Sequence, residues 1–216
     1  MLLLRLPGVY APAEDTQLLL SSVLAEPLPP NARACELGTG SGHIALELAA
    51  AGVGEVVAVD VARRAVLGTR INAALRRLPV RARRGDLLHG VAGLFDLIVA
   101  NPPYVPSCSP PPGAHSRARA WDAGRDGRSL LDRICRDAPS RLAPGGSLWL
   151  VHSALCDPGR TLALLAEQGL VAEVVKKDEI PFGPVMRSRA EWLRAEGLLG
   201  PGDNTETLVV VRGKRG

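Results

Sequence analysis

The sequence predicts an α/β domain with an open, doubly wound sheet, and three observations support this prediction. Strand-like stretches alternate with amphipathic helical stretches along the chain, which is the pattern of α/β proteins. A glycine-rich turn connects the first strand-like stretch to the next helical one, and polar residues follow four successive strands. The 216 residues, 46% of them hydrophobic and 22% charged, suffice for one domain with its own core. We therefore expect a single domain over residues 1–216.

The elements follow in order from local patterns. The apolar segment 18–24 predicts an initial helix, and the glycine turn is followed by a helix-like stretch over residues 43–51. Apolar or strand-like runs predict strands near residues 32–36, 55–60, 80–85, 95–100, 146–151, 170–176 and 205–212.

Two segments do not fit the simple alternation. The Pro-rich residues 106–113 predict no regular element, and we expect an active-site loop over residues 105–127, because long loops inside a domain are often functional. Simple disorder of residues 107–119 is the alternative. Residues 176–200 form an expected insertion before the last strand, with a helix-like stretch over 188–197. The insertion could dock a partner or wall a substrate cleft, or it could be an ornamental hairpin and helix.

The glycine turn spans residues 36–42, Glu-Leu-Gly-Thr-Gly-Ser-Gly. Glycines at alternate positions let the backbone approach a ligand, and the helix N-terminus beyond them offers free N–H groups to a carboxylate. The spacing differs from the dinucleotide fingerprint G-x-G-x-x-G, and Glu36 would repel a diphosphate. This argues against NAD and ATP and favours a positively charged nucleoside such as S-adenosylmethionine. A glycine-rich connection without a ligand is the alternative.

Two further carboxylates follow strands. Asp60 closes the apolar strand 55–59, at the edge where open parallel sheets bind ligands, and could accept hydrogen bonds from both ribose hydroxyls. Asp86 ends the next strand, and its carboxylate or the neighbouring backbone could read an adenine amino group. Taken singly, each could equally be a helix cap or a turn residue.

The tetrapeptide Asn101-Pro102-Pro103-Tyr104 follows the apolar run 94–100. The side-chain carbonyl of Asn101 and the backbone carbonyl of Pro102 can accept both N–H bonds of a planar amide or amine, while Tyr104 stacks on its flat face. The prolines have fixed φ angles and no N–H group, so the acceptors are set before a substrate arrives. The motif predicts methylation of a planar NH2 group, although Asn-Pro is also ordinary turn chemistry.

Together these motifs make the chain resemble class I S-adenosylmethionine-dependent methyltransferases, and among them the HemK-type glutamine N5-methyltransferases that modify translation release factors. The resemblance is closest to the short branch that lacks the N-terminal helical domain. The tetrapeptide is shared with DNA adenine and RNA guanine N-methyltransferases, so it indicates the chemistry better than the substrate. The matching stretches are 9–16 (Val-Tyr-Ala-Pro-Ala-Glu-Asp-Thr), 36–42, 101–104, 121–128 (Trp-Asp-Ala-Gly-Arg-Asp-Gly-Arg) and 206–208 (Glu-Thr-Leu).

The resemblance implies a Rossmann-like, seven-stranded methyltransferase sheet with helices on both faces and the last strand antiparallel. It also implies that residues 1–30 close the cofactor pocket. The implied catalytic residues are Asn101, Pro102 and Tyr104. The implied S-adenosylmethionine-binding residues are Glu14, Thr16, Glu36, Gly38, Thr39, Gly40, Gly42, Asp60, Val61, Asp86, Leu87 and Asn101. The implied substrate-binding residues are Asn101, Pro102, Pro103, Tyr104 and Trp121. For Asp15 and Thr16, capping of the first helix is a second interpretation, which can hold beside a pocket role.

Relatives in the short branch depend on a small zinc-binding activator subunit that covers an exposed apolar strand, so such a partner is a further expectation. The insertion at 176–200 departs from that branch and leaves the exact substrate open. The expected partner class is a protein substrate, such as a class I release factor.

Composition excludes several other classes. The net charge of +4 is concentrated in arginine clusters, but aromatic residues make up only 3% of the chain, which argues against a nucleic-acid-binding role. The four cysteines and four histidines show no metal-site spacing, so we expect reduced, structural cysteines and no metal. The opening apolar residues are too few to span a membrane, and we expect a cytoplasmic protein with no membrane partner.

Three functions therefore remain open from the sequence. The first is methylation of a glutamine amide in a release-factor Gly-Gly-Gln loop. The second is N-methylation of another substrate, such as an RNA or DNA base, a protein lysine or a small metabolite. The third is a cofactor-binding protein that no longer turns over.

Overall fold

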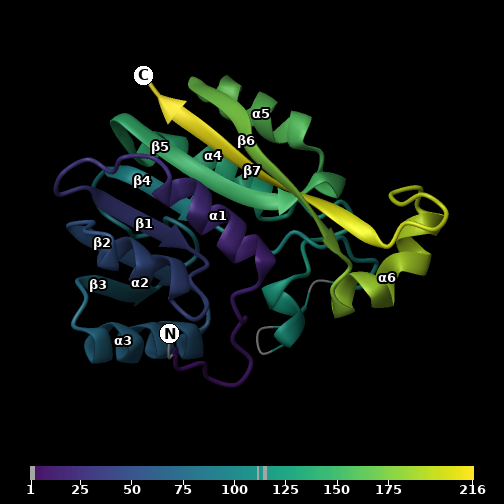
Figure 1. The fold of residues 1–216 in the computed structure, drawn as a ribbon, viewed down its shortest axis with the longest axis horizontal. Helices are drawn as coiled ribbons and strands as arrows, with labels where there is room; N and C mark the ends of the chain where they lie inside the picture. Colours follow the sequence, from purple (N-terminus) through teal and green to yellow (C-terminus); the bar gives the residue numbers. More distant parts are fainter. Residues whose placement is uncertain (1–2, 111, 114–115) are drawn as a thin grey trace.

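The computed structural model describes residues 3–110, 112–113 and 116–216. Its helices and strands succeed one another largely in the predicted alternation (Figure 1). In chain order they are α1 (Glu14–Leu24), β1 (Arg33–Leu37), α2 (His43–Ala50), β2 (Glu55–Asp60), α3 (Arg63–Arg76), β3 (Val80–Arg84), β4 (Phe95–Ala100), the 3-10 helix η1 (Arg117–Ala120), α4 (Leu131–Asp137), η2 (Pro139–Arg141), β5 (Leu142–Ser153), η3 (Ala154–Cys156), α5 (Pro158–Glu167), β6 (Leu170–Pro181), α6 (Pro184–Ala195) and β7 (Thr205–Arg215).

The seven strands form one sheet in the order β3-β2-β1-β4-β5-β7-β6. Neighbouring strands from β3 to β5 are parallel, whereas β7 runs antiparallel to both β5 and β6. The predicted doubly wound sheet with an antiparallel last strand is confirmed. Chain progression reverses between β1 and β4, and such a switch point opens a crevice beyond the carboxyl ends of these strands.

Helices cover both faces of the sheet (Figure 1). Alternate residues of each buried strand point to opposite faces, so Leu97 and Val99 of β4 join one apolar core and Ile98 and Ala100 join the other. The first core packs against α1, α2, α3 and α6, and the second packs against α4 and α5. The inner strands β2 and β4 therefore read as largely apolar runs, because both of their faces are buried.

The structure corrects the predicted start of the insertion. Strand β6 does not end near residue 176 but continues to Pro181, paired with β7 as far as Thr205. Its second half is charged, Lys-Lys-Asp-Glu, and was not recognised as a strand because those side chains are exposed on an edge strand. Residues 176–200 thus contain the end of β6, which pairs with β7, followed by α6. Helix α6 lies beyond the sheet, beside the loop after β4 (Figure 1).

Candidate active site

The tetrapeptide Asn101 to Tyr104 leaves the sheet at the switch point. Ala100, the last residue of β4, pairs with Leu37 of β1 on one side and with Leu150 of β5 on the other. Asn101 is half-buried, whereas Pro102 and Tyr104 are buried. The tetrapeptide 101–104, here called the clamp because it is predicted to hold the substrate, and the glycine turn after β1 therefore begin at neighbouring strand ends.

The first turn of α1 is tied to this tetrapeptide by side chains. The Nδ2 group of Asn101 donates to Oγ1 of Thr16 at 3.1 Å, and the hydroxyl of Tyr104 donates to Oδ2 of Asp15 at 3.1 Å. The hydroxyl of Tyr10 donates to the same oxygen at 2.9 Å. Asp15 and Thr16 are themselves buried. The N-terminal segment thus packs along one side of the tetrapeptide, and its role in closing a cofactor pocket stays a prediction.

Neither Asp15 nor Thr16 is the N-cap residue of α1, although the Asp15 carboxylate does accept one free backbone N–H of the first turn, that of Thr16, at 2.6 Å. The helix begins at Glu14 and its N-cap residue is Ala13, which makes no side-chain cap. Both polar side chains lie inside the helix and face the core beneath the tetrapeptide, because their hydrogen-bond partners lie there. Neither Asp15 nor Tyr10 was predicted to have this role, and their only sequence signal is polarity next to an apolar helix.

The glycine turn divides into an open part and a packed part. Gly38, Gly40 and Gly42 all have positive φ, of 72°, 54° and 83°. A Cβ on Gly38 would meet no atom within 4 Å, and one on Gly40 would come no closer than 3.9 Å to Tyr10. A Cβ on Gly42 would instead lie 2.7 Å from the Thr69 side chain. The first two glycines face space that a ligand could fill, and the third lets α2 pack against α3.

Glu36 and Thr39 fix the shape of this turn. Oε2 of Glu36 accepts from the Thr39 hydroxyl and, at 3.0 Å, from the N–H of Ala45 in α2. Burial raises the pKa of Glu36 to about 8, and the bonds from Thr39 and Ala45 offset this only in part. The carboxyl is thus turned into the loop, where it holds strand, turn and helix together.

Asp60 links the end of β2 to the same turn. Its Oδ2 accepts from the N–H of Gly40 at 2.9 Å and its Oδ1 accepts from the N–H of Ala62 at 2.8 Å. Burial raises its pKa, while these backbone bonds lower it. Each carboxylate oxygen keeps a second lone pair, so acceptor capacity for a ligand remains. The adjacent Val61 is 38% exposed, an apolar side chain open to a ligand.

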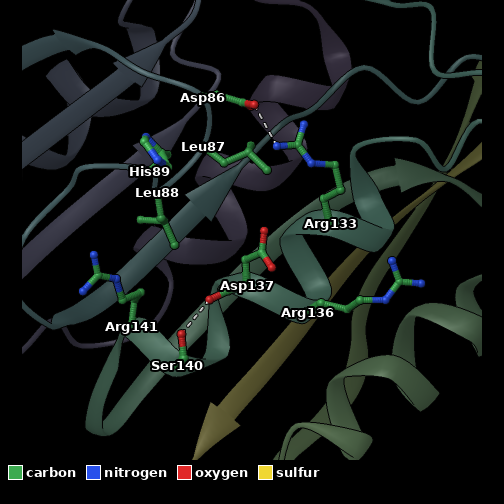
Figure 2. A pocket seen from close by; sticks show the side chains of 9 residues that line it. All are labelled: Asp86, Leu87, Leu88, His89, Arg133, Arg136, Asp137, Ser140 and Arg141. Atoms are coloured by element: carbon green, nitrogen blue, oxygen red, sulfur yellow. Dashed lines mark hydrogen bonds and ion pairs between the residues drawn. The ribbon is translucent and has the colours of Figure 1, made fainter.

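Asp86 and Leu87 lie on an open groove of about 420 Å³ between the loop after β3 and helix α4 (Figure 2). Oδ2 of Asp86 accepts from Nη2 of Arg133 at 2.8 Å, and both side chains are about half exposed. Leu87 has a φ of 49°, an uncommon backbone state for a residue other than glycine. The groove is lined by Asp86, Leu87, Leu88, His89, Arg133, Arg136, Asp137, Ser140 and Arg141.

Glu14 does not join these contacts. It is exposed and lines a second groove, of about 670 Å³, between α1 and β6. Its place in the cofactor pocket stays a prediction.

The loop after β4 folds back on itself. The N–H of Val105 donates to the Trp121 carbonyl at 2.8 Å, and the N–H of Ala123 donates to the Val105 carbonyl at 3.1 Å. Trp121 is half-buried against the core that contains Tyr104. A Cβ on Gly127 would lie 2.4 Å from the Tyr104 carbonyl oxygen, so only glycine lets the loop cross the tetrapeptide here. Residues 111, 114 and 115 of the segment for which disorder was the alternative lie outside the described residues.

Helix α6 holds this loop from outside. Nη1 of Arg189 donates to the Pro106 carbonyl at 2.9 Å, and its Nη2 forms an ion pair with the buried carboxylate of Asp122. Arg125 forms a second, exposed ion pair with Glu196 at 2.6 Å. The insertion thus supports the segment that carries Trp121, a function that the sequence alone did not show.

Glu206 is a buried acid near the site that the sequence analysis did not assign. It opens β7 at the same edge of the sheet, and its Oε2 has no hydrogen-bond partner among the described residues. Burial raises its pKa, the Ser153 side chain lowers it, and nearby Asp15 raises it further. The charged residue at the start of an apolar strand was the available signal.

Two further observations concern metal ions and membranes. In the described ranges, no group of three or more His, Cys, Asp and Glu side chains is arranged to hold a metal ion. Over the same ranges, no helix is long and apolar enough to cross a membrane.

The chain is similar to known proteins both in sequence and in structure. Residues 1–109 match the model of the methyltransferase small domain. A putative protein N5-glutamine methyltransferase of Methanocaldococcus jannaschii is 33% identical over 180 residues, which cover 83% of this chain and 90% of the relative. The release factor glutamine methyltransferase of Deinococcus radiodurans is 38% identical over 162 residues, which cover 72% of this chain but 57% of that longer protein.

Among solved structures, the chain resembles the E. cuniculi Mtq2-Trm112 complex, which is described as responsible for methylation of the translation termination factor eRF1. The TM-score is 0.67 at 26% identity, over 97% of this chain and 99% of the matched chain. The chain is therefore a methyltransferase, and it belongs to the family of protein N5-glutamine and release factor glutamine methyltransferases.

Proposed function

We propose that the protein transfers a methyl group from S-adenosylmethionine to the side-chain amide of a glutamine, in the Gly-Gly-Gln loop of a translation release factor. The observation that carries this proposal is the position of Asn101 to Tyr104 at the switch point, beside the open glycine turn and tied by hydrogen bonds to α1. Two acceptors and a buried aromatic ring suit a planar NH2 group, which glutamine presents. The names of the relatives support the same substrate class.

The residues around the turn fit S-adenosylmethionine. Gly38 and Gly40 leave their Cβ directions open, so a ligand can lie against the backbone. Asp60 retains acceptor capacity suited to ribose hydroxyls, and Val61 offers an apolar surface to a base. Glu36 does not itself contact this space, because its buried carboxyl is bonded to Thr39 and Ala45 inside the turn. When bound, the cofactor supplies an electrophilic methyl group on a positively charged sulfur.

The protein's own contribution is positioning. The substrate nitrogen must lie in line with the methyl carbon and sulfur, at about 3 Å from the carbon, before reaction can occur. Oδ1 of Asn101 and the carbonyl of Pro102 accept the two N–H bonds, which returns electron density to a nitrogen whose lone pair is otherwise delocalised. The tetrapeptide contains no carboxylate or histidine, so we propose that the proton leaves to water after transfer. The stacking of Tyr104 on the amide belongs to the same proposal.

A small activator subunit is a separate part of the proposal, motivated by the Mtq2-Trm112 complex. The free edges of this sheet are β3 and β6. Strand β3 carries Arg81, Arg83 and Arg84, and β6 exposes Val171 at 77%. A partner of β3 would therefore have to match a basic edge rather than an apolar one.

The cytoplasmic location stays a prediction.

The substrate assignment can be tested with a panel of methyl acceptors. The full-length protein is incubated with radiolabelled S-adenosylmethionine and a class I release factor, or the same factor with its Gly-Gly-Gln glutamine changed to glutamate. We expect label only in the factor that keeps its Gly-Gly-Gln glutamine. Equal labelling of both proteins would reject the glutamine, and labelling of RNA, DNA or lysine-containing peptides instead would identify another N-methyltransferase.

A further inference from the structure

The carboxylate of Asp15 collects an unusual set of hydrogen-bond donors. It accepts from the hydroxyls of Tyr10 and Tyr104, and its Oδ1 accepts from both the N–H of Thr16 at 2.6 Å and the Oγ1–H of Thr16 at 3.1 Å. The side chain is only 5% exposed, so these donors rather than water satisfy it. A carboxylate has about four acceptor positions and no hydrogen to donate. The direction of every bond around Asp15 is therefore fixed.

The Thr16 hydroxyl lies between Asp15 and Asn101, so its bond to Asp15 determines how it can bond to Asn101. Its hydroxyl has one hydrogen, and it lies 3.1 Å from Asp15 Oδ1 and 3.1 Å from the Asn101 side-chain amide. Because Asp15 can only accept, the hydrogen of Thr16 points to Asp15. Oγ1 of Thr16 can then only accept from Asn101, which must turn its NH2 group toward Thr16.

The two ends of an asparagine amide are nearly equal in shape but opposite in hydrogen bonding. With its NH2 group held by Thr16, Asn101 presents its carbonyl oxygen away from α1. We propose that Asp15, acting through Thr16, fixes which end of the Asn101 amide faces the methyl acceptor, and that both are positioning residues for methyl transfer. This inference rests on the proposed function, since it assumes an acceptor that donates N–H bonds to Asn101.

This series of hydrogen bonds from Asp15 through Thr16 to Asn101, here called the relay, explains why two polar side chains are buried in the first turn of α1 although neither is its N-cap residue. Without it, the Thr16 hydrogen could turn to the Asn101 carbonyl, and the amide could present NH2 to the substrate. Two donors would then face each other, and the productive geometry would be lost. The same carboxylate also holds the Tyr104 hydroxyl, so one residue orients both parts of the clamp.

The relay can be tested with two matched pairs of variants. Thr16→Val removes the hydroxyl at nearly constant shape, whereas Thr16→Ser keeps it. Asp15→Ala removes the acceptors. Asp15→Asn should keep the relay, because the Thr16 N–H at 2.6 Å requires an oxygen at the Oδ1 position and leaves the new NH2 for the tyrosine oxygens. Each variant is prepared as the full chain.

The first readout is the side-chain amide signal of Asn101 in a ¹⁵N-labelled protein, assigned by its loss in Asn101→Ala. We expect one NH2 proton that is shifted downfield and exchanges slowly in the wild type, Thr16→Ser and Asp15→Asn, but not in Thr16→Val or Asp15→Ala. The second readout is kcat for methylation of a class I release factor at saturating S-adenosylmethionine. We expect a loss of about 10- to 100-fold in Thr16→Val, the order reached when reacting groups are misplaced, with most of kcat retained in Thr16→Ser.

An unchanged Asn101 signal or an unchanged kcat in Thr16→Val would overturn the relay. Should Thr16→Val fail to fold, loss of the signal in Asp15→Asn would overturn it as well. The amide signal is measured without any substrate. If the wild type fails to methylate the release factor, the proposed function fails while the amide comparison still decides the relay.

Discussion

The two ends of the proposed active site differ in how completely they are formed. At the clamp end, Asn101 and Tyr104 are tied to Asp15 and Thr16, and these last two side chains are buried. At the groove end, Asp86 is exposed and paired only with the half-exposed Arg133. The difference matches the chemistry: acceptors that must orient a weak nucleophile are set in advance, while the groove end stays open enough to admit a ligand.

The strongest way to break the clamp end is Asn101→Ala. It removes the side-chain acceptor without adding bulk, and we expect kcat/KM to fall by about 100- to 1000-fold, as when one oriented hydrogen-bonding group is lost from an active site. Steady-state kinetics with a release factor measures this, and calorimetric titration with S-adenosylmethionine is the control. A loss of cofactor binding as large as the loss of rate would show that Asn101 serves the cofactor rather than the acceptor.

The second-largest effect is expected from the contacts of Arg189 in α6 with the loop after β4, here called the Arg189 brace. Arg189→Ala leaves the Asp122 carboxylate buried without its partner, which destabilises the loop that carries Trp121. We expect KM for the protein substrate to rise about tenfold, and hydrogen exchange in residues 105–127 to become faster. Arg194→Ala is the matched control, because the side-chain hydrogen bonds of this arginine of the same helix go, among the described residues, to the carbonyls of Gly200 and Asp203 and not to the loop. Equal effects of both variants would mean that α6 acts through general stability.

Glu36 should make the stability of the ligand-free protein depend on pH. Its pKa is raised by burial to about 8, so the folded state keeps a proton that the unfolded chain releases near its usual pKa. The unfolded state then binds fewer protons, and this group lowers the free energy of unfolding by up to about 1.4 kcal/mol per pH unit as the pH rises toward 8.

His152 acts in the opposite sense at lower pH. Burial lowers its pKa to about 4, so its contribution to stability rises with pH only up to its unfolded pKa of roughly 6.5. The Glu36 effect is therefore cleanest from about pH 6.5 to 8. Chemical denaturation of the wild type and Glu36→Gln measures it. Parallel stability curves for the two proteins would contradict it.

The smallest effect is expected at the groove end. Arg133→Ala removes a half-exposed ion pair, so the free energy of unfolding should change by no more than about 0.5 kcal/mol. If Asp86 is thereby released for an adenine amino group, S-adenosylmethionine should bind somewhat more tightly. Weaker cofactor binding would instead show that Arg133 helps to hold the ligand, and that the groove end is more completely formed than its exposure suggests.

The sequence predicted the fold and the motifs better than the contacts between them. Apolar runs and glycine turns mark strands that are buried on both faces, so most predicted strands lie close to the observed ones. The charged half of β6 was missed, and so was the start of β5 at residues 142–145, which contains Pro144 and Gly145. Thr16 and Asn101 are separated by 85 positions, and Asp15 and Tyr104 by 89. No local pattern reports which side chains meet over such separations, and for the same reason the Arg189 brace was not foreseen.

The central claim is that this chain methylates a glutamine amide held by Asn101. The most direct test is tandem mass spectrometry of a class I release factor after incubation with S-adenosylmethionine and either the wild-type protein or Asn101→Ala. The account predicts one added methyl group on the Gly-Gly-Gln glutamine with the wild type and none with the variant. A methyl group on any other residue, or the same modification from both proteins, would contradict it.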